Sequence, residues 1–252
     1  MSALEAEELR KHFGGVRAVD GLSFSLDEGE MLALIGPNGA GKSTTFALLG
    51  GQLRPDDGHV RLAGHDVTGA PPRRLARLGL ARTFQIAATF PSMTVRENVL
   101  VALNAHHRQS WHWWRPAERG FRRTSAALLA RVGLETEANR AAGQLAYADL
   151  KRLELAIVLA AQPRLLLMDE PTAGMGATDS AALMALVRGL ARGSGLAVLF
   201  TEHDSELVFG TADRILVLDR GALIASGTAA AIRADARVRE AYLGTPAPEA
   251  GP

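Results

Sequence analysis

The chain has 252 residues and a net charge of +1, with 47% hydrophobic and 22% charged residues. These values suit one sizeable globular domain, or a core with a smaller lobe, and give no electrostatic footprint of a nucleic-acid-binding protein. Because cysteine is absent, disulfides, thiolate metal sites and a cysteine nucleophile are excluded, and a reducing cytoplasm fits. The polar N-terminus does not resemble a signal peptide, and no apolar run reaches the roughly 20 residues that span a bilayer. We therefore expect any membrane role to be peripheral.

Four short apolar runs predict buried parallel strands, because such strands read as continuous rather than alternating hydrophobic segments. They are Met31–Ile35, 165–168, 196–201 and 214–218. Helical patterns at 42–51 and 179–192 alternate with these strands, which favours an α/β fold with a mostly parallel sheet covered on both faces.

The middle of the chain has a different pattern. From about 91 to 162 it is helical, with no convincing strand and with the best helices at 95–105, 124–132 and 149–161. This predicts a helical subdomain inserted between core segments 1–90 and 163–244. The Pro- and Ala-rich tail 245–252 is expected to be disordered.

A phosphate-binding motif follows the first strand. The segment 36–43 matches G-x-x-x-x-G-K-[ST] in full and opens a helix, so glycine-rich backbone and a helix N-terminus would present N–H groups to phosphates. Lys42 would reach the β- and γ-phosphates and Ser43 would hold Mg²⁺. The rival interpretation, a turn with a chance lysine, is weakened because only Lys11, Lys42 and Lys151 are lysines. The predicted contacts are Gly36, Pro37, Asn38, Gly39, Ala40, Gly41, Lys42, Ser43 and Thr44.

Two adjacent carboxylates follow the second apolar run. Asp169 and Glu170 stand at the carboxyl end of a predicted buried strand, where ligands of a parallel sheet bind. Asp169 would support Mg²⁺, and Glu170 would orient or deprotonate the attacking water. Alone, such a pair is usually the start of a solvated loop. Its combination with a phosphate motif favours the catalytic interpretation.

In this order, the motifs resemble those of the ABC ATPases over essentially the whole chain: 36–43, Gln85, 145–149, Asp169-Glu170 and His203. The segments 11–15, 82–85, 91–98, 202–204 and 232–244 look like the ATP-binding subunits of branched-chain amino acid uptake systems. The resemblance implies a P-loop NTPase core with an antiparallel β portion and an inserted helical subdomain, the ABC ATPase fold. It also implies an ATPase that powers a membrane transporter, most closely an importer of branched-chain amino acids or similar small polar solutes. Similar chains serve urea import and lipopolysaccharide export.

The resemblance assigns further roles. Gln85 falls at the glutamine that touches Mg²⁺ and senses the permease, and His203 at the histidine that contacts the γ-phosphate. Phe13 falls where an aromatic ring stacks on adenine, and the less favoured alternative is a core residue. The cofactors are ATP and Mg²⁺. The partners are integral membrane permease subunits, a second ATPase subunit (the same chain or a related one) and, indirectly, a solute-binding protein, at the cytoplasmic face of the cell membrane.

The sequence departs from the family in the signature peptide, which in the family contacts ATP held by the partner subunit. Here it consists of Leu145, Ala146, Tyr147, Ala148 and Asp149, without the usual serine, second glycine and glutamine. Asp149 could cap its own helix and would repel a phosphate. The alternative is that Tyr147 and the helix dipole suffice. Gly176 likewise stands where the family has Asp or Asn. We therefore expect an asymmetric heterodimer, with a homodimer still open.

The tryptophans cluster at Trp111, Trp113 and Trp114. They could pack within the helical subdomain, dock on the permease or contact lipid headgroups.

Two other classes of protein are alternatives to a transport ATPase. A soluble ABC ATPase of DNA repair or translation would carry long coiled coils or two fused ATPase domains, and neither fits in 252 residues with one phosphate motif. A P-loop kinase would have no reason to keep Gln85 and His203.

Overall fold

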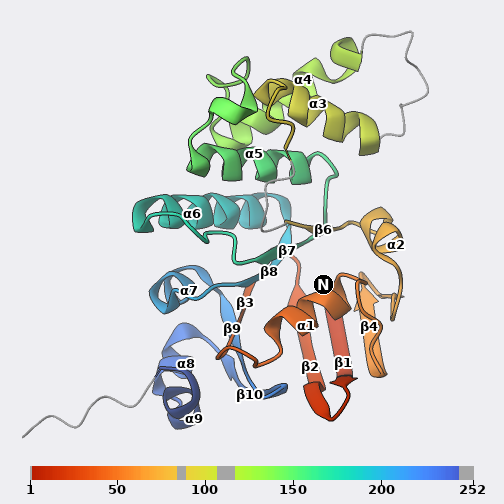
Figure 1. Ribbon diagram of the computed structural model, residues 1–252, viewed down its shortest axis with the longest axis vertical. Coiled ribbons are helices and arrows are strands. Elements are labelled where there is room, and N and C mark those ends of the chain that lie inside the picture. Colours follow the sequence, from red (N-terminus) through yellow and green to blue (C-terminus); the bar gives the residue numbers. More distant parts are fainter. Residues whose placement is uncertain (1, 84–88, 107–116, 244–252) are drawn as a thin grey trace, which may run out of the picture.

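A six-stranded sheet runs through the centre of the computed structural model, which describes residues 2–83, 89–106 and 117–243 (Figure 1). Its strand order is β10-β9-β3-β8-β7-β6, with β10 antiparallel to β9 and the other described pairs parallel. The strands are β3 (Met31–Ile35), β6 (Leu80–Arg82), β7 (Leu165–Asp169), β8 (Ala197–Thr201), β9 (Arg214–Asp219) and β10 (Ala222–Gly227). The four strands predicted from apolar runs are confirmed as β3, β7, β8 and β9.

Two hydrophobic cores lie on opposite faces of this sheet. Along β3, Met31, Ala33 and Ile35 enter one core, whereas Leu32 and Leu34 enter the other. This alternation explains why the strand is apolar at every position: both of its faces are buried. The first core contains side chains of α3, α5 and α6, and the second contains Phe46 of α1 together with the antiparallel sheet.

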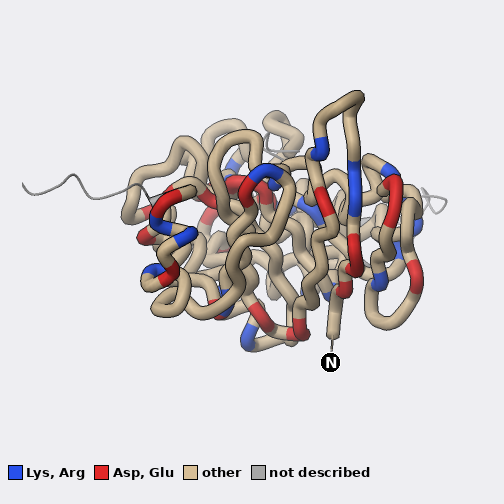
Figure 2. The backbone as a smooth tube through the Cα atoms, turned by 90° about the horizontal axis from the view of Figure 1, so that it is seen from below, with Lys and Arg blue, Asp and Glu red and all other residues tan. Residues whose placement is uncertain are grey.

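The antiparallel sheet has the order β2-β1-β4-β5. Its strands are β1 (Ser2–Phe13), β2 (Val16–Asp27), β4 (Asp57–Leu62) and β5 (His65–Asp66). Ion pairs link β1 with β4 or the residue before it, including Arg61–Glu7 at 2.8 Å and Lys11–Asp56 at 2.6 Å. Figure 2 shows basic and acidic residues interspersed along the strands. Because these strands have a polar face and their register is interrupted, their sequences contain no continuous apolar run that would predict them.

Helices cover the sheets and form one end of the molecule. Those with predicted counterparts are α1 (Lys42–Leu49), α3 (Val95–His106), α4 (Ala117–Val132), α5 (Tyr147–Leu159) and α6 (Ala177–Ser194). Shorter elements are α2 (Pro72–Arg77), the 3-10 turn Ala142–Gln144, α7 (Ser205–Thr211), α8 (Ala229–Ala234), α9 (Ala236–Val238) and the π turn Arg239–Leu243. Figure 1 shows α3, α4 and α5 together at the end away from the antiparallel sheet.

Within the described part of 91–162, β structure is limited to an isolated bridge between Thr94 and Ala141. The division into a core and an inserted subdomain stays a prediction, and the tail 245–252 lies outside the described residues. None of the helices searched among the described residues is long and apolar enough to cross a membrane.

Candidate nucleotide site

The phosphate loop, residues 36–43, connects β3 to α1. Gly41 has a φ of 100° and an added Cβ would stand 2.2 Å from the carbonyl oxygen of Ala18. At Gly36, with φ 150°, the Cβ would stand 2.2 Å from the carbonyl of Leu218. Any side chain at either position would collide with backbone, so glycine is required. The loop is thereby held tightly against β2 and β9, while Asn38, Gly39 and Ser43 are exposed.

Lys42 is buried, and its ammonium group lies within the loop. Its Nζ donates to the carbonyl oxygens of Gly36 at 2.6 Å and Pro37 at 3.0 Å. Burial lowers the pKa of Lys42, and the charges of Glu170 and Asp169 oppose that shift. The structure therefore brings the lysine of the phosphate motif and the predicted carboxylate pair into one electrostatic environment, as the sequence predicts.

Asp169 ends β7 and is held from two sides. Its Oδ1 accepts a hydrogen bond from the hydroxyl of Thr201 at 2.8 Å, and its Oδ2 accepts one from Nη2 of Arg82 at 3.1 Å. Both partners are the last residues of neighbouring strands, β8 and β6. The register of the parallel sheet places Asp169 directly opposite Thr201.

Glu170 has an unusual backbone, with φ 50°. This left-handed conformation is unfavourable for a residue with a side chain. It is held in place because the Glu170 N–H donates to the carbonyl and the hydroxyl oxygens of Thr201, at 3.2 and 3.1 Å. The Glu170 carboxylate lies 2.7 Å from Nε2 of His203. Thr201 therefore supports both adjacent acidic residues, and the predicted catalytic pair Glu170 and His203 lies within hydrogen-bonding distance.

The loop after Glu170 is fixed by a second buried carboxylate. Glu202 is 5% exposed and accepts hydrogen bonds from the Thr172 N–H at 2.9 Å and the Thr172 hydroxyl at 2.7 Å. Since Glu202 and His203 are adjacent, this contact ties the ends of β7 and β8 together. It fixes the backbone on both sides of the Glu170–His203 pair.

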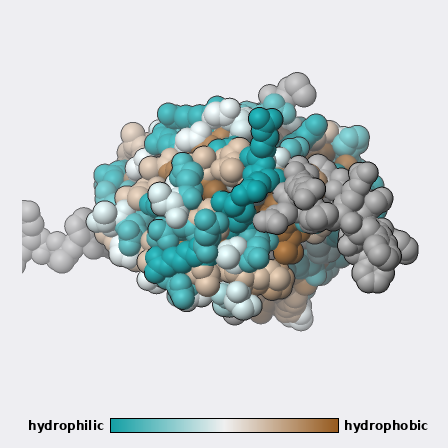
Figure 3. All heavy atoms as spheres, turned by 90° about the horizontal axis from the view of Figure 1, so that it is seen from above, coloured by the Kyte–Doolittle hydropathy of each residue, from teal (hydrophilic) through white to brown (hydrophobic). Residues whose placement is uncertain are grey.

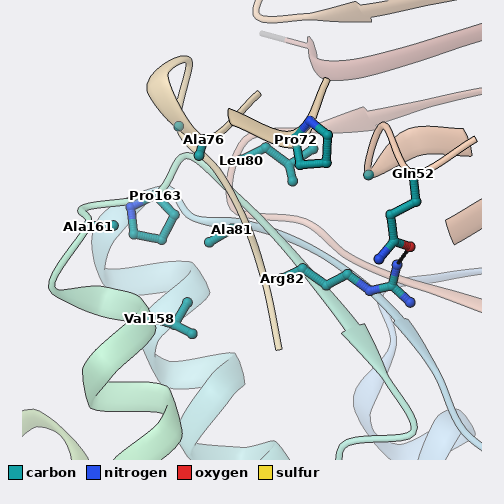
Figure 4. Close-up of a pocket in the computed structure, with 11 residues that line it drawn as sticks. Gln52, Pro72, Ala76, Leu80, Ala81, Arg82, Val158, Ala161 and Pro163 are labelled. Carbon is teal, nitrogen blue, oxygen red and sulfur yellow. Dashed lines mark hydrogen bonds between the residues drawn. The ribbon is translucent and has the colours of Figure 1, made fainter. Parts of the chain in front are cut away.

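Arg82 connects Asp169 to the region around α1. Its Nη1 donates to the side-chain carbonyl of Gln52 (Figure 4), and its guanidinium carbon lies 5.8 Å from the centre of the Phe46 ring. Arg82 also lines a hollow of about 260 Å³. In Figure 4 the hollow lies between Val158, Ala161 and Pro163 on one side and Ala76, Leu80 and Pro72 on the other.

The signature peptide begins α5, in the helical end of the molecule, while α1 lies beside the antiparallel sheet, at the level of β3 and β9, in Figure 1. Ala146 is the N-cap of α5 and makes no side-chain cap hydrogen bond. Asp149 lies in the first turn and pairs with Arg152 at 3.6 Å. The Tyr147 hydroxyl donates to the carbonyl oxygen of Ala173 at 3.2 Å. The idea that Asp149 is the cap of its own helix is therefore wrong, because Ala146 occupies the N-cap position. The hydroxyl hydrogen of Tyr147 is used in a hydrogen bond within its own chain.

Phe13 is 48% exposed at the end of β1, which contradicts its interpretation as a core residue. It pairs with Val16, itself 66% exposed, across the tip of the β1–β2 hairpin. The same β2 strand carries Ala18, whose carbonyl approaches Gly41 of the phosphate loop. An exposed ring on the hairpin beside the phosphate loop is what stacking on a base requires. Gln85 and the tryptophans Trp111, Trp113 and Trp114 lie outside the described residues.

Comparison with known proteins identifies the family. A family model described as ABC transporter matches residues 19–173, which includes the phosphate loop, the signature peptide and Asp169-Glu170. The chain belongs to the ABC transporter ATPase family. It is therefore an ATP-binding and ATP-hydrolysing subunit of a transporter. A second model, described as Branched-chain amino acid ATP-binding cassette transporter, matches residues 222–248 of this ABC ATPase.

Individual relatives cover almost the whole ABC ATPase chain. It is 40% identical over 248 residues to the high-affinity branched-chain amino acid transport ATP-binding protein BraF of Pseudomonas aeruginosa, covering 96% of this chain and 97% of that protein. It is also 40% identical, with the same coverage, to LivG of Salmonella typhimurium, which carries the same description. Among solved structures, the ADP conformation of MJ1267, an ATP-binding cassette of an ABC transporter, gives a TM-score of 0.86 at 31% identity, covering 97% of this chain and 100% of that one.

Several residues of the site were not predicted as functional from the sequence. Thr201 and Gln52 belong to no motif. Glu202 and Arg82 belong to segments that resemble the family, 202–204 and 82–85, yet nothing in those segments indicates that Glu202 holds Thr172 or that Arg82 pairs with Asp169. The position of Arg82 as the last residue of a strand, two residues before the Phe84-Gln85 pair, is the one signal that could have drawn attention to it.

Proposed function

We propose that this ATPase powers an importer of branched-chain amino acids or similar small polar solutes. The observation that carries the proposal is the match of residues 222–248 to the model of branched-chain amino acid cassettes. This segment includes β10, α8 and α9 and lies outside the sequence motifs that would bind ATP. It therefore distinguishes a subgroup and does not merely repeat the general requirements of ATP binding. The descriptions of BraF and LivG support the same substrate class.

ATP would bind with its triphosphate over the phosphate loop and its adenine against Phe13. The exposed backbone of Gly39 supports this, because an added Cβ would meet nothing within 4 Å and the loop is open to a ligand. Lys42 would exchange its bonds to the Gly36 and Pro37 carbonyls for phosphate oxygens. The remaining contacts would be the backbone of the loop and the first residues of α1, Ser43 and Thr44.

The residues present also fit Mg²⁺. Among the described residues, no group of three or more His, Cys, Asp or Glu could hold a metal ion by itself. Mg²⁺ instead usually takes one or two oxygen ligands from the protein, and phosphates and waters complete its coordination shell. The Ser43 hydroxyl and the Asp169 carboxylate are ligands of this kind. Gln85 is proposed as a third donor. When bound, Mg²⁺ supplies charge neutralisation between the β- and γ-phosphates.

Glu170 is proposed as the residue that orients and deprotonates the attacking water. The proton would pass to its carboxylate, and His203, 2.7 Å from Oε1, would steady that carboxylate and contact the γ-phosphate. Thr201 and Glu202 would hold the backbone from which both side chains project. The signature residues Leu145, Ala146, Tyr147, Ala148 and Asp149 would complete the ATP site of the partner ATPase, because they lie at the start of α5 in the helical end of the molecule, away from α1 and this chain's own phosphate loop (Figure 1).

The proposed partners are two integral membrane permease subunits, a second ATPase subunit of related sequence and, through the permease, a solute-binding protein. The hollow beside Arg82 and the exposed side chains Phe90, Met93 and Val101, which are 36–50% exposed, offer apolar contacts to a permease. Figure 3, looking onto the helical end, shows small hydrophobic patches among hydrophilic residues. Such a docked subunit would lie at the cytoplasmic face of the cell membrane.

Reconstitution tests the proposal. The ATPase would be co-expressed with the permease subunits, partner ATPase and binding protein of its transporter, and the complex placed in liposomes. ATP-dependent uptake of labelled leucine is expected, and the same complex with Glu170→Gln should show little uptake. Uptake of urea in place of leucine would overturn the substrate class but leave the transport role intact. Failure to co-purify with any integral membrane subunit would contradict the transport role in this chain.

A further inference from the structure

The two groups that donate hydrogen bonds to Asp169 differ in charge. Thr201 donates a neutral O–H to Oδ1, whereas Arg82 places a permanent positive charge 3.1 Å from Oδ2. Asp169 and Arg82 are 13% and 18% exposed, so water screens this ion pair only in part. A carboxylate has about four acceptor positions, of which these bonds use two. Asp169 therefore keeps acceptor capacity, but part of its negative charge is already balanced within the chain.

Arg82 is anchored independently of Asp169. The Gln52 side chain holds Nη1 and the Phe46 ring lies beneath the guanidinium group. Both partners come from α1 or the turn that follows it, and neither is bonded to Asp169 in the contacts described. If a cation approached Asp169, Arg82 could release Oδ2 and still retain a hydrogen bond and an aromatic contact. The contacts with Gln52 and Phe46 would therefore hold the Arg82 side chain without Asp169.

We propose that Arg82 is a positioning residue that competes with Mg²⁺ for Asp169. In the nucleotide-free chain it aligns and neutralises the carboxylate. When Mg²⁺ enters with ATP, two cations share one carboxylate, and their mutual repulsion weakens metal binding until Arg82 releases Oδ2 and keeps only its contacts with Gln52 and Phe46. Arg82 thus sets the Mg²⁺ concentration at which the site becomes competent. This inference rests on the proposed metal role of Asp169.

The test is the Mg²⁺ concentration that gives half-maximal binding of a fluorescent, non-hydrolysable ATP analogue to the full chain. Arg82→Met keeps the length and apolar stem but removes the charge. We expect its half-saturating Mg²⁺ concentration to fall roughly threefold to tenfold, the scale of one partly screened charge interaction. Arg82→Lys, which restores the charge, should return the value to within about twofold of the parent. Electron paramagnetic resonance of Mn²⁺ in the same complexes gives a spectroscopic check without nucleotide fluorescence.

Arg61→Met is the matched control, because it removes the same charge from an exposed arginine that pairs with Glu7 in the antiparallel sheet, away from Asp169. Competition predicts that this variant leaves the half-saturating Mg²⁺ concentration unchanged. If Arg82→Met raises or preserves the value, Arg82 only supports the structure and the inference is wrong. Arg82→Gln would replace Arg82→Met if thermal denaturation showed that the latter does not fold. An Asp169→Asn chain with parental Mg²⁺ dependence would instead contradict the metal role proposed for Asp169, on which the inference rests, whereas the importer function is tested separately by uptake.

Discussion

The helices α1 and α5 begin in similar ways and differ in charge. Neither has a side-chain cap hydrogen bond from its N-cap residue, Gly41 or Ala146. Both helix starts thus leave backbone N–H groups and the positive end of the dipole available to an anion. The first turn of α1 contains Lys42 and no acidic residue, whereas that of α5 contains Asp149. An uncapped helix start is therefore well suited to bind phosphate at α1 and poorly suited to bind it at α5.

This difference implies that the chain contributes unequally to the two ATP sites of a dimer. One site would be built on its own phosphate loop, Asp169, Glu170 and His203. The other would be completed by its depleted signature peptide. The hydrogen bond from Tyr147 to Ala173 strengthens the contrast, because the tyrosine proton is used within the chain. The site built on this chain's phosphate loop is the strong half-site, and the signature peptide, residues 145–149, is this chain's weak half-site.

Glu170→Gln should have the largest effect. Removing a general base is expected to reduce ATP turnover roughly 10²-fold or more, while ATP binding stays nearly intact because the substitution preserves shape. Turnover in the assembled transporter and equilibrium ATP binding measure the two quantities. Glu206→Gln, a surface substitution in the first turn of α7, is the control and should behave like the parent. Parental turnover in Glu170→Gln would show that another residue activates the water.

Lys42→Met should weaken binding itself. The side chain loses its charge but keeps its stem, and the loss of charge-assisted hydrogen bonds to phosphate, at about 1.5–3 kcal/mol each, predicts roughly a 10- to 100-fold higher dissociation constant for ATP. Isothermal titration calorimetry measures it. The fold should survive, because the buried ammonium group is replaced by an apolar one. An unchanged dissociation constant would exclude Lys42 from phosphate binding.

The strong half-site was largely predictable from the sequence because its parts are local. The phosphate loop is one continuous segment, and Asp169 and Glu170 follow a strand that is apolar throughout. The partners of these residues were not predictable in the same way. Thr201 reaches Asp169 through the register of β7 with β8, and Arg82 reaches it from the end of β6. Such contacts depend on strand pairing across large sequence separations, which residue spacing does not reveal.

The antiparallel sheet shows the same limit in the fold. β1 contains Glu5, Glu7, Glu8 and Arg10 on or near its exposed face, so its hydrophobic pattern is weak and broken by register shifts. The resemblance to a family predicted an antiparallel portion without locating it. The cap role considered for Asp149 failed for a related reason, since the start of α5 at Tyr147 placed this residue in the first helical turn.

Restoring the signature peptide tests the weak half-site. Ala146→Ser, Ala148→Gly and Asp149→Gln together should raise turnover at the partner's ATP site, because they remove one carboxylate and one steric obstacle from the helix start. The expected gain in interaction free energy at that site is on the order of 1–3 kcal/mol. The isolated parent chain is expected to be a monomer or weak dimer with low ATPase activity.

The decisive comparison for this asymmetry uses the reconstituted pair of ATPases. Turnover is measured with Glu170→Gln in this chain alone, and then with the equivalent change in the partner alone. The strong site is built on this chain's phosphate loop, so the first change should cause the greater loss. Equal losses would refute the asymmetric arrangement and make the altered signature a neutral variant.

Phe13 carries the smallest predicted effect. Because its ring is 48% exposed, Phe13→Ala removes little buried surface and should leave the melting temperature nearly unchanged. If the ring stacks on adenine, the same substitution should weaken ATP binding by about 1 kcal/mol or somewhat more, the scale of aromatic stacking on a base. Phe13→Tyr and Phe13→Trp keep an aromatic face and should bind ATP like the parent. Val16→Ala, at the more exposed residue paired with Phe13 across the hairpin, is the matched control for effects on the strand pair. Equal ATP affinity in Phe13→Ala and Val16→Ala would show that the hairpin tip does not contact the base, and adenine would then have to be held elsewhere on the strong half-site.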